Sequence, residues 1–401
     1  MGTQAVVKDS RAARRVLPLL ASTGISVTGD GAFIAAAPLL AVTLTRDPVA
    51  VASVTAAFYI PWLVFGLPAG ALVDRWPRRT VMVAADLARA AVLAFLVAAL
   101  AAGYLALPIL LAAVLVVGVA QCFFDSAAQA SIPALVGRDK ETLTHVNGRY
   151  WALDTVGRSL LGPPLGSLSF AVNRGLPFVA DAVSFVLSAM FVRRLPVIPA
   201  ADGPHERIGT AIRAGLRHLL RTRDLRVLAV SMGAYNFGWN MAMGTFVLYA
   251  ADVLSLPSAF YGVLLAVSAV GGVVAGWRAQ FLTRRTSYRQ TMAVAHLVQG
   301  AAWLGIALAG NVWATAVLLA ALGAGSALSS VAVGSARQAM TPDHLLGRVV
   351  SAFRLFGLGA AGIGALVGGG IASGFGLTAT LIAASAVLVV AGVLTWPYGR
   401  R

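Results

Sequence analysis

Charge and cysteine are both scarce in this sequence. Charged residues make up 11% of the 401 residues and hydrophobic residues 59%, whereas a soluble domain has about 25% charged and about 45–50% apolar residues. A soluble globular protein is therefore excluded. The single cysteine, Cys122, excludes a disulfide framework, and the five histidines show no metal-ligand spacing. We accordingly expect no cofactor and no metal site.

Motifs of catalysis are missing as well. The sequence has no Walker-type phosphate loop, no metal cluster, and no histidine at a recognisable spacing from a serine or cysteine. A membrane-embedded enzyme would need one of these, so we expect the protein not to be an enzyme.

Long apolar runs fill the chain instead. The mean hydropathy is +0.82, and a helix that crosses the bilayer needs about 20 apolar residues. The runs predict an all-α polytopic membrane protein with twelve transmembrane helices. The predicted spans are residues 16–44, 48–73, 80–102, 104–134, 148–171, 175–195, 225–252, 258–282, 287–309, 311–340, 346–373 and 376–397. Glycines gather in the second and eleventh spans, where we expect them to permit close helix packing.

Lysine and arginine are concentrated in alternate loops. Most of the 31 fall on one side of the predicted membrane, and only Arg46 and Arg174 fall in loops on the other side. Because cytoplasmic loops are enriched in these residues, we expect both termini in the cytoplasm and the protein in the inner (plasma) membrane. The net charge of +16 is divided among short loops, which favours anionic membrane lipids as partners and argues against nucleic acid.

The two halves of the chain are similar. The stretch GALVDRWPRRT (70–80) aligns without gaps on GWRAQFLTRRT (276–286), and SAAQASIP (126–133) aligns on SARQAMTP (335–342) at nearly the same offset. Parallel repeats of this kind predict two six-helix bundles related by an axis along the membrane normal, with a cavity near the midplane. We predict an N-terminal bundle at 1–195, a cytoplasmic linker with an amphipathic helix at 196–224, and a C-terminal bundle at 225–401.

The first copy of the repeated loop resembles the signature between helices 2 and 3 of the major facilitator superfamily, G-x-L-x-D-R-x-G-R-[KR]. The matching residues are Gly70, Leu72, Asp74, Arg75, Arg78 and Arg79. In span number, loop charge and repeat, the resemblance covers the whole chain. Gly-Asp in helix 1 and GRSLLGPPLGS in helix 5 are similar to features of the drug:proton antiporters related to the enterobactin and macrolide exporters. In the helix 5 motif Arg158 and Ser167 replace small residues, so that match is partial.

The resemblance implies that this loop is a cytoplasmic latch between the two halves. The latch residues would be Gly70, Asp74, Arg75, Arg78, Arg79 and Asp125. Asp74 would lie at the N-terminal end of helix 11, where the helix dipole favours a carboxylate, and Arg78 would pair with Asp125. Gln280 replaces Asp74 in the second copy, so we expect the latch to be asymmetric.

Carboxylates in the interior of the predicted spans all lie in the first half of the chain, and the spans of the second half contain only Asp252, at the end of a span. The interior carboxylates are Asp30, Asp86, Asp125, Asp154 and Asp181. A charge at the bilayer centre costs about 2.5–3.5 kcal/mol on insertion scales, so each carboxylate is a functional candidate. Asp30 lies about 20 Å along helix 1, close to the midplane, and the repeat places the neutral Asn236 at the equivalent position. Asp30 is therefore the first candidate for proton coupling.

Two other carboxylates have an arginine at helical spacing. Asp154 and Arg158 are further proton-coupling candidates, with an ion pair on one helix face as the alternative. Asp86 and Arg89 are interpreted as an ion pair of this kind. Asp181 is interpreted as an N-terminal cap of helix 6.

Aromatic and amide side chains cluster in helix 7. The substrate-binding candidates are Tyr235, Asn236, Trp239, Asn240 and Met243, with Tyr59 and Trp62 of helix 2. Such residues suit bulky amphipathic molecules, while anchoring at the membrane interface explains Tyr59 and Trp62 equally.

Together these features predict a monomeric secondary transporter that exports amphipathic small molecules against protons by alternating access. The alternatives are a dedicated exporter of one natural product, such as a siderophore or an antibiotic, and a facilitator without ion coupling.

Overall fold

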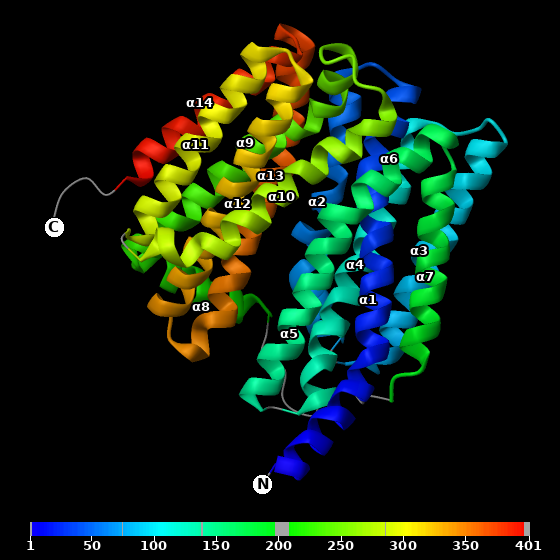
Figure 1. Cartoon of the computed structure of the whole chain (residues 1–401), viewed down its shortest axis with the longest axis vertical. Helices are drawn as coiled ribbons and strands as arrows, with labels where there is room; N and C mark the ends of the chain where they lie inside the picture. Colours follow the sequence, from blue (N-terminus) through cyan, green and yellow to red (C-terminus); the bar gives the residue numbers. More distant parts are fainter. Residues whose placement is uncertain (1, 74, 138, 197–207, 285, 397–401) are drawn as a thin grey trace. The chain divides into compact units, whose positions relative to one another are not determined.

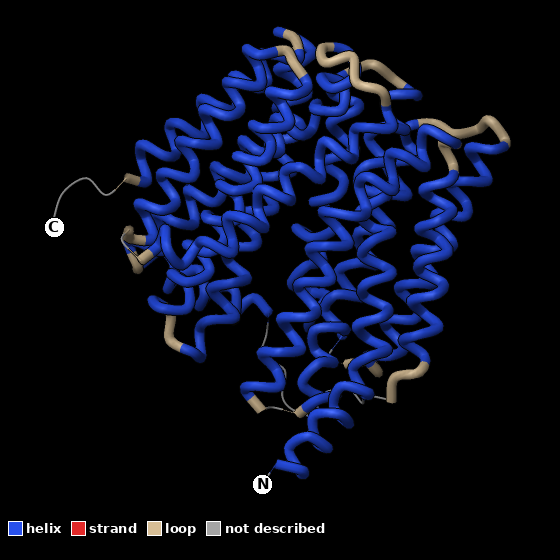
Figure 2. The backbone as a smooth tube through the Cα atoms, in the orientation of Figure 1, coloured by secondary structure: helices blue, strands red, loops and turns tan. Residues whose placement is uncertain are grey.

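The computed structural model describes residues 2–73, 75–137, 139–196, 208–284 and 286–396. Over these residues the chain is helical, with short connections and no strand (Figure 2). This agrees with the all-α architecture that the apolar runs predict.

Helices α1 to α7 form the first half of the chain. Their bounds are α1 Gly2–Leu44, α2 Pro48–Val73, α3 Arg78–Ala101, α4 Leu107–Val136, α5 Lys140–Thr155, η1 Val156–Leu161, α6 Gly162–Val172 and α7 Leu176–Arg193. The fifth predicted span, 148–171, corresponds to α5, the π-helical turn η1 and α6 in direct succession. Helix α5 begins earlier than predicted because Asp139 caps it, accepting a hydrogen bond from the Thr142 amide at 2.9 Å.

Helices α8 to α14 form the second half. Their bounds are α8 Ile208–Arg221, α9 Arg223–Asp252, α10 Ser258–Thr283, α11 Tyr288–Ala309, α12 Val312–Met340, α13 Asp343–Phe375 and α14 Leu377–Thr395. Ser287 and Gln290 form a capping box at the start of α11, and the Asn311 side chain caps α12. The two copies of the repeated loop both join one long helix to the next, at α2–α3 and at α10–α11.

Among the described residues, ten helices are long and apolar enough to cross a membrane. The other two predicted spans are also helical: the α5–η1–α6 run is divided by the π turn, and α9 contains amide and charged residues that lower its hydropathy. The structure therefore agrees with the predicted order of spans.

The chain divides into two compact units (Figure 1). Unit 1 contains Met1–Ala37 and Val64–His205, and unit 2 contains Pro38–Leu63 and Glu206–Arg401. The change between His205 and Glu206 falls inside the predicted linker, whereas the first part of α2 groups with unit 2. The predicted division at 1–195, 196–224 and 225–401 stays a prediction.

Glycines allow close contact between α9 and α13 in unit 2. A Cβ at Gly364 or Gly368 would collide with the backbone of Phe237 or Met241, respectively. Because lipid removes the hydrophobic driving force between helices, such close packing is a main source of association in a membrane. The predicted packing role is confirmed for these two glycines, but a Cβ at Gly70 or Gly370 would meet open space.

Helix α8 lies in the predicted linker and packs on the start of α13. A Cβ at Gly215 would overlap the Arg348 carbonyl group, and Leu219 is 1% exposed in a cluster with Val349 and Phe353. Arg217 is exposed. The predicted amphipathic helix is thus present, with its apolar side against α13.

Candidate functional site

Asp30 lies near the middle of α1 and is 4% exposed. The residues directly before and after Asp30 are Gly29 and Gly31, so α1 has no side chain at these two neighbouring positions. A Cβ at Gly31 would lie 2.6 Å from the Arg158 carbonyl oxygen, and one at Gly29 would overlap the Asp181 carboxylate. The sequence Gly-Asp-Gly therefore lets two other helices approach Asp30 closely.

The helix that approaches Asp30 most closely is interrupted by η1. A Cβ at Gly162 would lie 2.6 Å from the Gly31 Cα, and one at Gly166 would overlap the Ala32 backbone. Gly157, within η1, is similarly close to Thr28. Single π-helical turns occur often at functional sites, and here the turn carries Arg158. The spacing of Gly157, Gly162 and Gly166 in the sequence is the signal for this close contact with α1. The contact was not predicted from the sequence.

Two arginines flank Asp30. The Arg158 guanidinium lies 3.2 Å from Asp30 and 3.2 Å from Asp154. The Arg89 guanidinium lies 3.6 Å from Asp30 and forms an ion pair with Asp86. Both ion pairs that the helical spacing predicts are therefore present, and each arginine also contacts Asp30.

Arg89 is enclosed by protein. Its side chain is 0% exposed, lies over the rings of Phe124 and Phe185, and donates a hydrogen bond to Gln121. Gln121 in turn donates to Asp125 at 2.8 Å. This glutamine, which the sequence did not single out, extends the polar network from Asp30 through Arg89 to Asp125.

The expected capping role of Asp181 is wrong. Helix α7 begins at Leu176, so Asp181 lies inside the helix, where it is fully buried. One carboxylate oxygen accepts a hydrogen bond from the Ser184 hydroxyl at 3.1 Å. Its other oxygen has no hydrogen-bond partner within the described chain.

Carboxylates outnumber arginines in this cluster. In the described spans of unit 1, Arg89 and Arg158 form ion pairs with Asp30, Asp86 and Asp154, and two further carboxylates, Asp125 and Asp181, lie near them without such a pair. An isolated carboxylate is costly away from water. The cluster can therefore accept protons without losing its arginine contacts, which is the chemistry that proton coupling needs.

The residues of the expected latch are only partly described. Asp74 lies outside the described residues. Arg78 donates a hydrogen bond to the Ala130 carbonyl at 2.7 Å, and Arg79 donates to the Leu195 carbonyl at 3.1 Å. Arg75 is exposed. Asp125 accepts a hydrogen bond from Gln121, and its pairing with Arg78 stays a prediction.

Aromatic candidates from α9 form a cluster in unit 2. The Tyr235 ring stacks on His296, with centroids 5.9 Å apart, and its hydroxyl donates to Ser326 at 2.9 Å. Trp239 lies between Tyr235 and Trp303, at centroid distances of 6.0 and 5.8 Å. The sequence did not predict that His296 and Trp303 belong to this cluster, although their spacing of two helical turns on α11 places them on one face. His296 is fully buried, in agreement with its interpretation from sequence as an interior histidine.

The amide candidates contact α2 and their own helix. Asn240 is 2% exposed, donates to the Asn236 carbonyl at 2.9 Å, and hydrogen-bonds the Tyr59 side chain. Asn236 donates to the Met232 carbonyl at 2.9 Å. The structure thus brings Tyr59 to the amides.

The remaining two substrate candidates, Trp62 and Met243, are not part of the aromatic cluster or the amide contacts described above. For Trp62, the guanidinium of Arg354 lies 5.3 Å from its ring centroid. Met243 is half-buried on α9.

Comparison with known proteins decides the family. The sequence profile of the family described as transmembrane secretion effectors matches residues 17–398. The chain belongs to this family of the major facilitator superfamily. It is a multi-pass membrane transporter and not an enzyme, as the sequence predicts.

Relatives of this major facilitator chain span nearly its full length. It is 32% identical over 377 residues to the multidrug efflux pump Tap of Mycolicibacterium fortuitum, covering 91% of both chains. It is 28% identical over 387 residues to the Tap pump of Mycobacterium tuberculosis, covering 94% of this chain and 91% of the relative. It is also 25% identical over 401 residues to the uncharacterized MFS-type transporter YfiS of Bacillus subtilis, covering 95% and 92%.

Solved structures agree on the fold. A point mutant of the nucleoside transporter NupG has a TM-score of 0.79 at 12% identity, with 94% of this chain and 98% of NupG covered. A bacterial homologue of the iron transporter ferroportin has a TM-score of 0.72 at 18% identity, with 95% and 98% covered. At these identities the likeness concerns the major facilitator fold alone.

Proposed function

We propose that this transporter exports amphipathic small molecules and couples the export to proton movement. The observation that supports coupling is the cluster around Asp30 inside the spans of unit 1. There Asp30, Asp86 and Asp154 share two arginines, and two further carboxylates lie near them, Asp125 and Asp181. Protonation of Asp30 weakens its attraction to Arg89 and Arg158, and each arginine keeps another carboxylate. A proton can therefore bind or leave while the arginines remain paired.

Support for export comes from the relatives and from unit 2. Two relatives that match more than 90% of this chain are named multidrug efflux pumps. The half-buried rings of Tyr235 and Trp239 supply apolar surface, with the buried Trp303 packed against Trp239, and the half-buried Tyr59 supplies a hydroxyl group. This combination suits bulky amphipathic substrates. We propose small molecules and protons as its partners, a monomer as the working form, and the inner membrane, with cytoplasmic termini, as its location.

Transport in vesicles tests the proposal. The purified protein is reconstituted with an amphipathic fluorescent dye, and a proton gradient is imposed with and without a protonophore. Proton-coupled export predicts dye accumulation against its own gradient that the protonophore abolishes. Equilibration without accumulation indicates an uncoupled facilitator. A panel of structurally unrelated drugs in an efflux-deficient host then distinguishes a multidrug exporter from a dedicated natural-product exporter, which would protect against one compound class.

The asymmetric loops give a prediction on the proposed latch. Asp74→Asn should lower the transport rate about fivefold or more, because coupling between two states is typically worth about 1–3 kcal/mol. Gln280→Ala should have a smaller effect, since Gln280 has no charge. Initial dye-export rates, normalised to protein amount in the membrane, measure both. Greater loss in Gln280→Ala than in Asp74→Asn would contradict the latch.

A further inference from the structure

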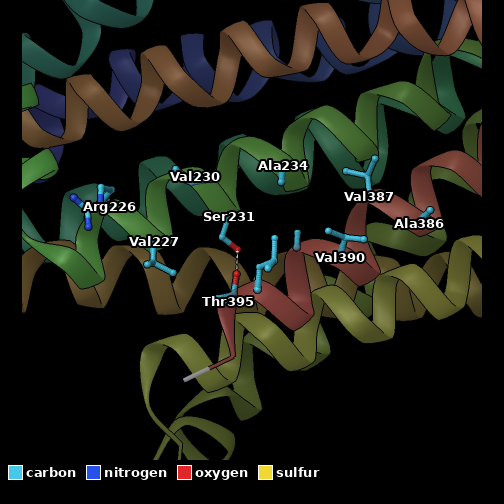
Figure 3. A pocket seen from close by; sticks show the side chains of 11 residues that line it. Arg226, Val227, Val230, Ser231, Ala234, Ala386, Val387, Val390 and Thr395 are labelled. Atoms are coloured by element: carbon cyan, nitrogen blue, oxygen red, sulfur yellow. Dashed lines mark hydrogen bonds between the residues drawn. The ribbon is translucent and has the colours of Figure 1, made fainter. Parts of the chain in front are cut away.

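A groove of about 640 Å³ lies between α9 and α14 in unit 2 (Figure 3). It is lined mainly by valine, alanine and leucine, and none of its described lining residues is aromatic. Val230 and Leu394 on its walls are 64% and 71% exposed, so the groove opens sideways on an apolar surface. Its lining differs from the aromatic cluster around Tyr235 and Trp239, and suits a flexible hydrocarbon chain better than a planar molecule.

Polar groups within the groove are satisfied by the protein. The Thr395 hydroxyl donates to the Ser231 hydroxyl at 2.7 Å, as the dashed line in Figure 3 shows, and Ser231 is within 3.1 Å of His296 Nδ1. An occupant therefore does not need to hydrogen-bond the middle of the groove. This again favours a hydrocarbon chain.

Arg226 supplies the charge at one end of the groove, opposite the end formed by Ala386 and Val387 (Figure 3). Its side chain is exposed and donates to the Leu220 carbonyl at 3.1 Å, and no carboxylate forms an ion pair with it in the described chain. The nearby Arg289 is different, because it contacts Asp224 at 3.4 Å and donates to the Thr395 carbonyl at 3.1 Å. Arg226 can therefore bind an external anion.

We propose that the α9–α14 groove binds an anionic phospholipid, with an acyl chain along the aliphatic lining and the headgroup phosphate at Arg226. The length of the groove along α9 agrees with this assignment. Arg226 and Ala234 are eight residues apart on α9, about 12 Å along the helix axis. One leaflet of the hydrocarbon core is about 15 Å thick. The groove thus matches the depth of an acyl chain whose headgroup remains at the membrane surface.

Native mass spectrometry of the purified protein in detergent tests the proposal without a transport assay. The protein is titrated with phosphatidylglycerol and, separately, with phosphatidylcholine of the same acyl chains. The wild type should retain one phosphatidylglycerol about fivefold more tightly than phosphatidylcholine, since one basic residue near the membrane surface contributes about 1 kcal/mol. Equal retention of the two lipids would overturn the proposal.

Matched variants separate the headgroup from the chain. Arg226→Gln should remove the preference for phosphatidylglycerol, whereas Arg217→Gln, an exposed arginine outside the groove, should keep it. Ala386→Phe should fill the groove and lower retention of both lipids, while Val393→Phe, exposed on the same helix but outside the lining, should not. Thermal unfolding of each variant confirms that it is folded.

Two results would contradict the lipid assignment. If Arg226→Gln keeps the wild-type preference, the charge does not bind the headgroup. If Ala386→Phe leaves phosphatidylglycerol retention unchanged but weakens binding of the transported dye, measured by fluorescence anisotropy on the same samples, then the groove holds substrate and not lipid.

Discussion

Asp30→Asn is expected to abolish proton-driven accumulation of the exported substrate while the protein still folds. With one-for-one exchange, a gradient of one pH unit supports about tenfold accumulation, because about 1.4 kcal/mol corresponds to a factor of ten. The variant should accumulate no dye above equilibrium. Folding should survive because Arg89 keeps Asp86 and Arg158 keeps Asp154 when the Asp30 charge is removed.

Substrate binding should also survive in Asp30→Asn. An asparagine amide and a protonated carboxyl group have similar size and both donate a hydrogen bond. The measurements are dye accumulation in vesicles with an imposed gradient and dye affinity of the purified variant. Asp252→Asn is the control, because Asp252 is an exposed carboxylate that pairs with Arg46 in unit 2. Undiminished accumulation in Asp30→Asn would remove Asp30 from the mechanism and direct attention to Asp125 or Asp154.

Much of the fold could be predicted because the bilayer fixes the length of each apolar run. Hydropathy does not mark where a helix begins outside the membrane. The predicted span at 148–171 therefore missed about the first two turns of α5, which starts at Lys140. Helix α9 is among the least apolar of the long single helices, since Asn236 and Asn240 lower its hydropathy, yet its apolar run was long enough to predict the span at 225–252. The internal repeat agrees with that span, because it requires six helices in each half.

The candidate site was predicted less completely, because its geometry depends on contacts between helices. Helical spacing alone was enough to pair Asp154 with Arg158. The approach of Arg89 to Asp30 depends on how α3 packs against α1, which no local pattern contains. Asp181 was misassigned although the predicted span begins at 175, one residue from the true start of α7 at Leu176. Its burial against Gly29 of α1 is a contact between helices, which no local pattern contains.

Arg89→Gln should cause a large loss of stability in unit 1. Removing one partner of a buried ion pair typically costs about 3–5 kcal/mol, because the other charge is left without compensation. Here Asp86, itself fully buried, would lose its arginine, and the contacts of the guanidinium with Phe124 and Phe185 would be lost as well. The free energy of unfolding in mixed micelles, obtained by detergent titration, measures the loss.

A double variant separates lost charge from lost packing. Asp86→Asn combined with Arg89→Gln removes both charges, so it should recover part of the stability that Arg89→Gln loses, and the double-mutant cycle should give a coupling of about 0.5–3 kcal/mol. Arg158→Gln is the comparison, because its side chain is 26% exposed and can be solvated; it should destabilise the protein less than Arg89→Gln. If Arg89→Gln is as stable as the wild type, Asp86 carries no charge in the folded protein. The main contacts of Arg89 would then be those with Gln121 and the aromatic rings.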